Sequence, residues 1–354
     1  LRGTSIFNGS ITNISVIEIT DDTNLPRIDY SPYSGAGTCG HWLFEPQSTN
    51  LLTYSEDFTQ WTTLNFTANS ETTIAPNGNT VNGYDFGDGY IFKDTAALDG
   101  SSSYTNSIYI KANKSATIGL RKGGASDGTD DVDINLTTSW QRFEATSVTS
   151  VTYPGRLLLD NRTIKGYGVS DLKVFIFAAQ QERLSYATSY IPTNGSTVTR
   201  NQESANGAGS SDLINSTEGV LYVETAALAD DSVIEGISIS DGTVSNKVVI
   251  FKWNTSNSMR GRVTASGVNS LNQTFSVDDI KSFNKIAISY AENNFSIWLN
   301  GVEVFTDTSG AVPVGLNKLQ FDIGGGGSNF YGKCKTVAVF KEALTDDELE
   351  CLTS

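Results

Sequence analysis

The chain has 354 residues, enough for two or three domains of ordinary size, each with its own core, and we count two. Its 39 Asp and Glu against 24 Lys and Arg give a formal net charge of -15 at pH 7. This charge repels nucleic acid and anionic membranes, so we expect neither a nucleic-acid partner nor membrane insertion, whereas a neutral sugar, a cationic surface or calcium remains compatible with it.

The cysteines and the apolar runs exclude several further classes of protein. Cys39, Cys334 and Cys351 are too few and too scattered for a disulfide framework or a zinc site. Cys334 and Cys351 could pair, but we expect free buried thiols. No apolar run is long enough to span a bilayer, since residues 174–179 are only strand-sized. The chain starts at Leu1 without a signal-peptide pattern, so we expect a fragment or a processed product.

Residues 1–50 form an N-terminal segment with two short apolar stretches, at residues 11–19 and 25–30. A Gly-rich stretch follows at residues 34–40. This pattern predicts one or two short strands and an ordered connector rather than a self-sufficient domain.

Strand-like runs recur at short intervals through residues 51–200. They alternate between apolar and polar residues, and Gly, Asn and Asp lie between them. Examples are residues 89–93, 104–111, 116–121, 140–146, 156–160 and 172–177. Period-two alternation with turn residues between the runs predicts an antiparallel β-sandwich.

Two phrases frame this domain. Residues 45–58 read Glu-Pro-Gln-Ser-Thr-Asn-Leu-Leu-Thr-Tyr-Ser-Glu-Asp-Phe, and residues 189–200 read Ser-Tyr-Ile-Pro-Thr-Asn-Gly-Ser-Thr-Val-Thr-Arg. Together they resemble the entry and exit of a jelly-roll module, similar to carbohydrate-binding modules, that recurs in tail and other structural proteins of bacteriophages and prophages. The phrase Thr138-Ser-Trp-Gln-Arg-Phe143 resembles the strand of such modules in which the Trp and the Phe pack into the sandwich.

Residues 201–217 are small and polar, which predicts a linker, and a second all-β domain follows at residues 218–354. Asn300-Gly301 between alternating hydrophobic runs predicts a hairpin. Thr345 and Glu348 have the spacing of a capping box at the start of a short C-terminal helix. The strand, hairpin and closing helix resemble the concanavalin A-like, laminin-G-like sandwich. The fold class is therefore all-β, with two tandem antiparallel β-sandwiches: a jelly roll, then a concanavalin A-like domain.

The sequence offers no catalytic constellation. His41 is the only histidine, and although Cys39 lies two residues earlier, no third partner is evident, so we expect a structural role. Glucanases of the concanavalin A-like fold place Glu-x-Asp-x-x-Glu on one strand, and no such strand is present. The acidic cluster at residues 346–350 is explained by the dipole of the predicted helix. We therefore assign no catalytic residue and expect a protein that is not an enzyme.

An acidic loop is a candidate for structural calcium, which jelly-roll modules often hold. The sequence from Asp127 to Asp133 places oxygen ligands at Asp127, Asp130, Asp131 and Asp133. Its spacing is not that of an EF-hand. A solvated turn explains the same residues more simply.

Aromatic side chains are the candidates for sugar contact, because sugar rings stack on exposed aromatic faces. We nominate Trp61, Tyr84, Tyr90, Trp253 and Trp298 as glycan-binding residues. Sandwiches also bury aromatics on their inner faces, so core packing is the alternative for each of them. We expect Trp140 in the core beside Phe143.

The phage-type phrases imply a non-enzymatic virion component, namely a tail-fibre, tail-tip or head-fibre adhesin that binds host-surface glycans. Such a protein lies on the virion surface or outside the cell, contacts other virion subunits and is commonly a homotrimer. Weak sugar contacts would act through multiple copies. One alternative is the glycan-binding ancillary region of a secreted polysaccharide-degrading enzyme. Another is a purely structural virion or decoration protein, because both roles use the same kind of β-domain.

Overall fold

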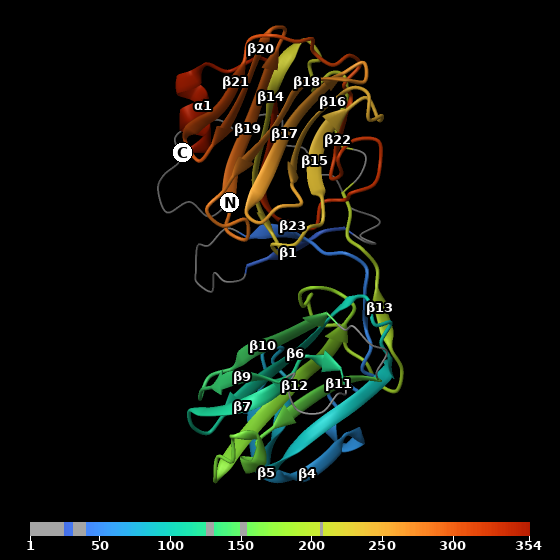
Figure 1. The fold of residues 1–354 in the computed structure, drawn as a ribbon, viewed down its shortest axis with the longest axis vertical. Helices are drawn as coiled ribbons and strands as arrows, with labels where there is room; N and C mark the ends of the chain where they lie inside the picture. The colour runs from blue at the N-terminus through green and yellow to red at the C-terminus, as the bar shows by residue number, and fades with distance from the viewer. Residues whose placement is uncertain (1–24, 31–39, 125–130, 149–153, 206–207) are drawn as a thin grey trace, which may run out of the picture.

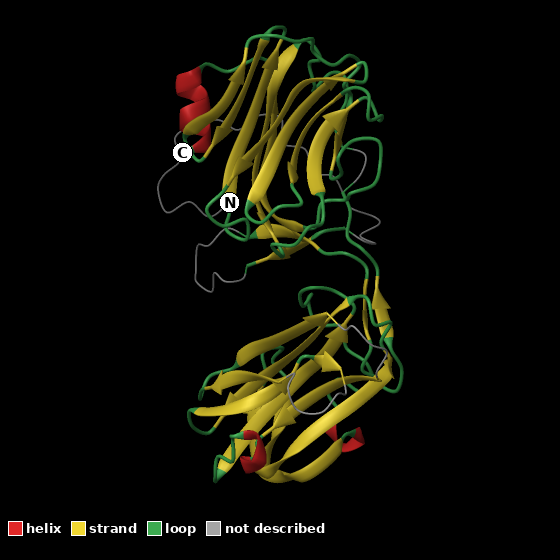
Figure 2. Ribbon diagram, viewed as in Figure 1, coloured by secondary structure: helices red, strands yellow, loops and turns green. Residues whose placement is uncertain are grey.

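A computed structural model of the chain describes residues 25–30, 40–124, 131–148, 154–205 and 208–354. These residues form two β-sandwiches that are stacked end to end (Figure 1). The predicted all-β class is confirmed, because both lobes consist of antiparallel strands and the described residues contain a single α-helix on the side of the upper lobe (Figure 2). No helix in this part of the chain is both long and apolar enough to cross a membrane.

The first sandwich is one continuous sheet folded into two layers. Its strand order is β10-β6-β12-β5-β11-β7-β9, with β4 paired to β5 and β8 paired to β11. The fold depends on β5, which pairs with β12 through residues 83–86 and with β11 through residues 90–97. The elements are β4 (Thr62–Ile74), β5 (Thr80–Ala97), β6 (Ser103–Ala112), β7 (Ala116–Arg121), β8 (Gly123–Gly124), β9 (Asp131–Leu136), β10 (Gln141–Val148), β11 (Pro154–Asp160), β12 (Leu172–Glu182), and the 3-10 helices η1 (Phe58–Gln60) and η2 (Thr163–Lys165).

The second sandwich packs a seven-stranded sheet, β1-β2-β23-β14-β19-β20-β21, against a five-stranded sheet, β18-β17-β16-β15-β22. Its elements are β1 (Arg27–Asp29), β2 (His41–Phe44), β14 (Glu218–Ala227), β15 (Glu235–Ser240), β16 (Lys247–Lys252), β17 (Ser258–Ala265), β18 (Val268–Ser276), β19 (Asn284–Ala291), β20 (Asn294–Leu299), β21 (Val302–Asp307), β22 (Lys318–Gln320), β23 (Gly332–Phe340) and α1 (Asp346–Thr353). Alternate residues of the facing strands, such as Val248, Ile250 and Ile288, fill the core between the sheets.

The hairpin and the capping box predicted for this domain are both confirmed. Asn300 and Gly301 connect β20 to β21 with φ of 47° and 84°, the positive values that a tight hairpin turn requires. Thr345 caps α1: its side chain accepts a hydrogen bond from the Glu348 amide, and the Glu348 carboxylate accepts one from the Thr345 amide.

The N-terminal strands belong to the second sandwich. β1 (Arg27–Asp29) pairs with β2 (His41–Phe44), and β2 pairs with β23, so Trp42 lies opposite Cys334. The segment expected to be a linker also contributes, because Ile214 is buried in the core of the second sandwich. The first sandwich is thus inserted into the second one between β2 and β14.

The two framing phrases pair with each other at the junction between the two sandwiches. β3 (Ser48–Asn50) pairs with β13 (Val198–Arg200). The buried Glu45 carboxylate accepts a hydrogen bond from the Ser189 amide at 2.8 Å and forms an ion pair with Arg200 at 2.7 Å. Arg27 forms ion pairs with both Glu45 and Glu203. We call these five residues (Arg27, Glu45, Ser189, Arg200 and Glu203) the Glu45 clasp. It joins the N-terminal strands to both ends of the inserted sandwich.

The cysteines within the described residues are both free. Cys334 is buried, as expected, and its burial raises the pKa of the thiol to about 12. Cys351 is exposed on α1, which corrects the expectation that it is buried. Cys39 lies outside the described residues.

Replacing Glu45 by Gln should destabilise the chain by about 3 kcal/mol, because Arg200 loses its carboxylate partner in the clasp and Arg27 loses one of its two. Urea unfolding measures this loss. Glu71→Gln is the control, because the Glu71–Lys173 ion pair is largely exposed to solvent and should contribute little to stability. Equal losses in the two variants would contradict a special role for the clasp.

Candidate functional site

The described surface of the first sandwich carries a cleft where the framing phrases meet β5 and β12. It consists of two hollows that share Glu56, one of about 500 Å³ and one of about 190 Å³. Residues 55–57 and 192–194 line the larger hollow. The smaller hollow is lined by Glu56, Phe58, Thr80, Val81, Asn82, Tyr84, Ile176 and Phe177. We call this the Glu56 cleft.

A hydrogen-bond network fixes the floor of the Glu56 cleft. The Tyr190 hydroxyl lies 2.5 Å from the Ser55 hydroxyl and donates to the Glu56 carboxylate at 2.8 Å. The Thr193 amide donates to the Ser55 hydroxyl at 2.8 Å. The Thr193 hydroxyl itself is buried and has no hydrogen-bond partner among the described residues. Since an unpaired buried hydroxyl costs free energy, an added hydrogen-bond partner at this position would be favourable.

A bulge in β12 lies beside the smaller hollow. The pairing of β12 with β6 shifts register between Phe177 and Gln180. Ala178 within the bulge has φ of 55°, a conformation that costs a residue with a Cβ about 1 kcal/mol. Bulges of this kind often lie next to binding sites, where they redirect a side chain.

The cleft is acidic and rich in hydrogen-bonding groups. Hydrogen bonds from Thr59 lower the pKa of Asp57, which therefore stays ionised at neutral pH. Burial and the nearby Asp57 charge raise the pKa of Tyr84, which keeps its hydroxyl neutral. With the amides of Asn82 and Asn194, the cleft offers both donors and acceptors to a neutral, hydroxyl-rich ligand.

Two of the nominated tryptophans are buried. Trp61 is 6% exposed and donates from its ring nitrogen to the Tyr54 carbonyl at 2.9 Å. Trp298 is also 6% exposed and packs in the same small cluster as Leu349 of α1. Neither ring presents a face to solvent, which corrects the expectation that they lie open to a sugar.

The other three nominated aromatics are partly exposed, and they lie in different places. Tyr84 lines the Glu56 cleft and stacks on Phe66 with ring centroids 4.7 Å apart. Tyr90 lies under the Arg162 guanidinium at 4.9 Å, and Trp253 lies under Arg260 at 3.3 Å. The chain therefore does not bring the nominated residues into one site, and only Tyr84 lies in the Glu56 cleft.

Trp140 is not a core residue. It lies against a small cluster around Phe177, outside the main core, and its ring nitrogen donates to the Ile74 carbonyl at 2.7 Å. Its expected neighbour Phe143 does pack against the main core of the first sandwich.

The acidic loop is described only in part. Asp127 and Asp130 lie outside the described residues. Asp131 forms an ion pair with Arg121, and Asp133 accepts a hydrogen bond from the Tyr167 hydroxyl at 2.8 Å. Within the described ranges, no group of three or more His, Cys, Asp or Glu side chains is arranged to hold a metal ion. Calcium binding by this loop stays a prediction.

His41 is buried in β2, where its ring makes a T-shaped contact with the Phe283 ring. Its Nε2 lies 3.6 Å from an Asp29 carboxylate oxygen. Burial lowers the pKa of His41, with the neighbouring Asp29 acting in the opposite direction. Its expected companion Cys39 lies outside the described residues.

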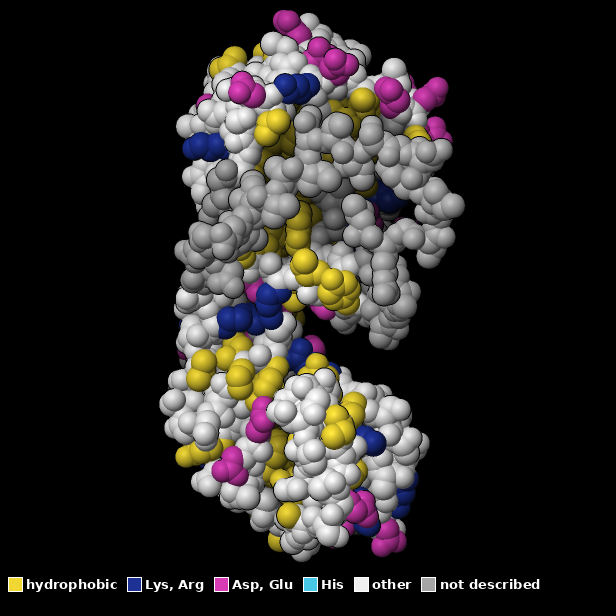
Figure 3. All heavy atoms as spheres, turned by 180° about the vertical axis from the view of Figure 1, so that it is seen from behind, with side chains coloured by type: hydrophobic (Ala, Val, Ile, Leu, Met, Phe, Trp, Pro, Cys, Tyr) yellow, Lys and Arg dark blue, Asp and Glu magenta, His cyan; other side chains and the backbone are white. Residues whose placement is uncertain are grey.

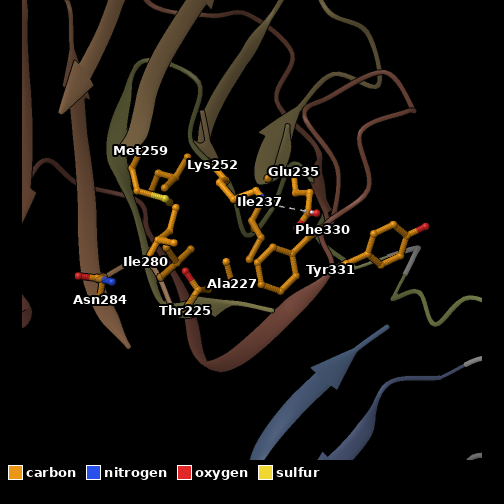
Figure 4. Close-up of a pocket in the computed structure, with 13 residues that line it drawn as sticks. Thr225, Ala227, Glu235, Ile237, Lys252, Met259, Ile280, Asn284, Phe330 and Tyr331 are labelled. Carbon is orange, nitrogen blue, oxygen red and sulfur yellow. Dashed lines mark ion pairs between the residues drawn. The ribbon is translucent and has the colours of Figure 1, made fainter. Parts of the chain in front are cut away.

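A second, narrower pocket opens between the sheets of the second sandwich (Figure 4). Its volume is about 20 Å³, enough for one water molecule but not for a sugar. Glu235 and Lys252 face each other across it at 3.6 Å, and Lys252 also pairs with Asp231 at 2.6 Å. Burial raises the pKa of Glu235 to about 7.

The sequence pattern did not single out Glu56, Asn82 or Thr193. Glu56 and Thr193 both lie in the framing phrases, at the two predicted ends of one domain. Polar residues at those two ends were therefore the sequence signal that could have located the cleft. Asn82 lies on β5 two residues before Tyr84, on the same side of the strand.

Residues 221–350 match the family model of the concanavalin A-like lectin/glucanases superfamily. The second sandwich is therefore a domain of the concanavalin A-like type, as its hairpin and closing helix predicted. The match covers less than half of the chain. A search of curated proteins found no match.

Several solved structures show weaker similarity. One is the CBM40 of Ruminococcus gnavus IT-sialidase bound to α2,3-sialyllactose, at 14% identity and a TM-score of 0.35, over 42% of this chain and 94% of that chain. Another is domain 4 of AbnA, a GH43 extracellular arabinanase from Geobacillus stearothermophilus, in complex with arabinotriose, at 14% identity and a TM-score of 0.34, over 48% and 81%.

A third is the NanB sialidase from Streptococcus pneumoniae, at 16% identity and a TM-score of 0.33, over 40% of this chain and 25% of that chain. These similarities are too weak to assign a ligand to this chain. None of the comparisons indicates a phage origin.

The raised pKa of Glu235 predicts a specific pH dependence of stability. Between its ordinary value of 4.5 and about 7, the folded chain binds this proton more tightly than the unfolded chain does. The contribution of Glu235 to the free energy of unfolding should therefore fall as pH rises through this window, by about 3 kcal/mol in total. Glu235→Gln should remove this fall, so the variant gains stability over wild type at pH 8 relative to pH 5.

Urea unfolding at the two pH values tests this expectation. Glu303→Gln on the exposed side of β21 serves as the control and should leave the pH dependence unchanged. The same pH difference in wild type and in Glu235→Gln would show that Glu235 does not titrate in this range.

Proposed function

We propose that this chain is a non-catalytic glycan-binding protein and that its first sandwich holds a neutral, hydroxyl-rich glycan in the Glu56 cleft. The observation that carries the proposal is the buried Thr193 hydroxyl, which lines the cleft without a partner beside the ordered Ser55–Tyr190–Glu56 network. Small numbers of fixed polar groups beside aromatic side chains are the usual composition of a sugar site. The match of the second sandwich to a superfamily that includes lectins supports the same function.

The two pocket carboxyls with shifted pKa values, Asp57 and Glu235, do not suit hydrolysis. A glycosidase needs one carboxyl that keeps its proton near neutral pH and donates it to the leaving group. Asp57 does not suit that role, because its pKa is lowered. Glu235 has a raised pKa, but it lies in a pocket with room for only one water. Neither carboxyl therefore combines a suitable pKa with access to a sugar.

A narrower proposal places the chain outside the cell, as a phage virion adhesin that contacts other virion subunits and forms a homotrimer. Its support is the resemblance of the framing phrases to phage modules. Multiple copies would raise the avidity of a weak sugar site. The ancillary region of a secreted polysaccharide-degrading enzyme and a structural virion protein remain the rival proposals.

The Thr193 hydroxyl gives a sharp test of the cleft. Thr193→Val should not destabilise the free chain, because the hydroxyl has no described partner to lose, yet it should weaken glycan binding about fivefold, the equivalent of about one hydrogen bond. Glu56→Gln and Asn82→Ala should weaken binding similarly. A glycan screen followed by calorimetric titration of the best neutral hit measures these effects.

Thr188→Val is the matched control, because the buried Thr188 hydroxyl donates to Glu182. It should destabilise the chain by about 1–3 kcal/mol and leave sugar affinity unchanged in the folded protein. Unchanged affinity in all three cleft variants would show that the glycan binds outside the Glu56 cleft. Absence of binding to any glycan would favour the structural role, and release of new sugar ends would favour an enzyme.

A further inference from the structure

The five-stranded sheet of the second sandwich, β18-β17-β16-β15-β22 (Figure 1), has strands that differ in charge from the rest of the chain. Strand pairing places Arg260 opposite Phe251 and Arg262 opposite Val249, with Lys247 on the same face of β16. Thr274 and Asn272 of β18 continue these rows. The residues between them, such as Ile250 and Val263, point into the core.

The strands carry no acidic side chain on this outer face, and Asp322, just after β22, is the carboxylate that acts on Lys247 at its edge. The single carboxylate within the strands β15, β16, β17, β18 and β22 belongs to Glu235, which lines the inner pocket instead. The sequence contains no Asp or Glu from residue 242 to residue 277, although it has 39 in total. Elsewhere, Asp and Glu side chains lie on the surface of both sandwiches, as Figure 3 shows for the opposite side of the molecule.

The two guanidinium groups are held by rings and neutral acceptors. Arg260 lies 3.3 Å from the Trp253 ring centroid and donates from Nε to the Thr274 hydroxyl at 2.7 Å. Arg262 lies 5.2 Å from the Phe251 ring centroid and donates from Nε to the Asn272 side-chain oxygen at 3.1 Å. Neither arginine forms an ion pair with a described residue. Their terminal nitrogens likewise have no hydrogen-bond partner in the described part of the chain.

These cations also destabilise one another. Burial lowers the pKa of both arginines, and Arg262 further lowers the pKa of Arg260. Burial and Arg262 lower the pKa of Lys247, while Asp322 acts in the opposite direction. Lys247 donates to the Ile323 carbonyl at 2.7 Å, so it too is held by a neutral acceptor.

The first sandwich also contains two arginines that stack on aromatic rings, which can be compared with Arg260 and Arg262. Arg156 lies 4.0 Å from the Phe92 ring centroid, and Arg162 lies 4.9 Å from that of Tyr90. There, each arginine is neutralised, Arg156 by Asp94 at 2.6 Å and Arg162 by Asp160 at 2.5 Å. Stacking an arginine on a ring of a sheet face therefore does not explain why Arg260 and Arg262 lack carboxylate partners.

We infer that the β17–β18 part of this face, which carries the partly exposed Arg260 and Arg262, is a second binding site that takes an anionic glycan. A guanidinium donates two parallel hydrogen bonds to a carboxylate or sulfate group, and the ring beneath each one fixes its plane. The two arginines are two residues apart on one strand, or about 7 Å, so they suit neighbouring anionic groups of one polymer. Asn272 can bond the sugar hydroxyls beside them.

This site does not depend on the Glu56 cleft, which is acidic and lies on the other sandwich. The negative charge of the remaining chain repels a polyanion and leaves this face as the favourable approach. Binding should therefore weaken as salt screens the attraction. Carboxylate and sulfate share the required chemistry, and the test distinguishes them.

The experiment measures binding of the full chain to immobilised polygalacturonate, heparin and neutral dextran at low and physiological salt. We expect a polyanion to bind, and Arg260→Gln and Arg262→Gln each to weaken it about tenfold or more, since a hydrogen bond to a charged group is stronger than a neutral one. Polygalacturonate binding alone identifies a carboxylate site, heparin binding alone a sulfate site, and binding of both a general anion site.

Arg156→Gln and Arg162→Gln are the matched controls, because they remove the same type of stacked arginine from the first sandwich. They should leave polyanion binding unchanged, as should Thr193→Val in the Glu56 cleft. Thermal unfolding should show that Arg260→Gln and Arg262→Gln remain folded, because each relieves repulsion between like charges. The inference would be overturned if neither polyanion bound at low salt, or if Arg260→Gln and Arg262→Gln bound as well as wild type. Neither result would affect the proposal for the Glu56 cleft.

Discussion

The arrangement of the molecule depends on one buried carboxylate. Glu45 lies at the junction of the two sandwiches and meets Arg27 from the N-terminal strand and Arg200 from the end of the inserted sandwich. A buried carboxylate is tolerated only with such partners, so the three segments must come together for any of them to be stable there. The same phrases continue into Glu56 and Thr193, so the clasp also positions the wall of the cleft.

The two sandwiches present opposite surfaces to a ligand. The Glu56 cleft combines carboxylates, amides and a neutral tyrosine, whereas the sheet around Arg262 has cations without neighbouring carboxylates on its strands. This division of charge follows from the sequence, because the acidic residues are concentrated outside residues 242–277.

The features that were predictable from the sequence are mostly local. Strand alternation gave the all-β class, and Asn300-Gly301 and the Thr345–Glu348 box form the expected turn and cap because their partners lie within a few residues. Alternation also placed Trp298 on a sheet face, but it does not reveal that α1 covers that face. The pairing of β2 with β23 was not predictable either, since it joins residues almost 300 positions apart, a separation for which composition gives no signal.

The inserted position of the first sandwich determines which parts of the chain can be replaced as a unit. β3 and β13 lie side by side, so the inserted sandwich leaves and re-enters its host at one place, as a long surface loop would. The entropy needed to close such a loop rises only slowly with its length, and a domain with adjacent ends folds around its own core. The first sandwich can therefore be exchanged as a cassette. Cutting the chain at residues 201–217 would instead remove β1 and β2 from the edge of the second sandwich.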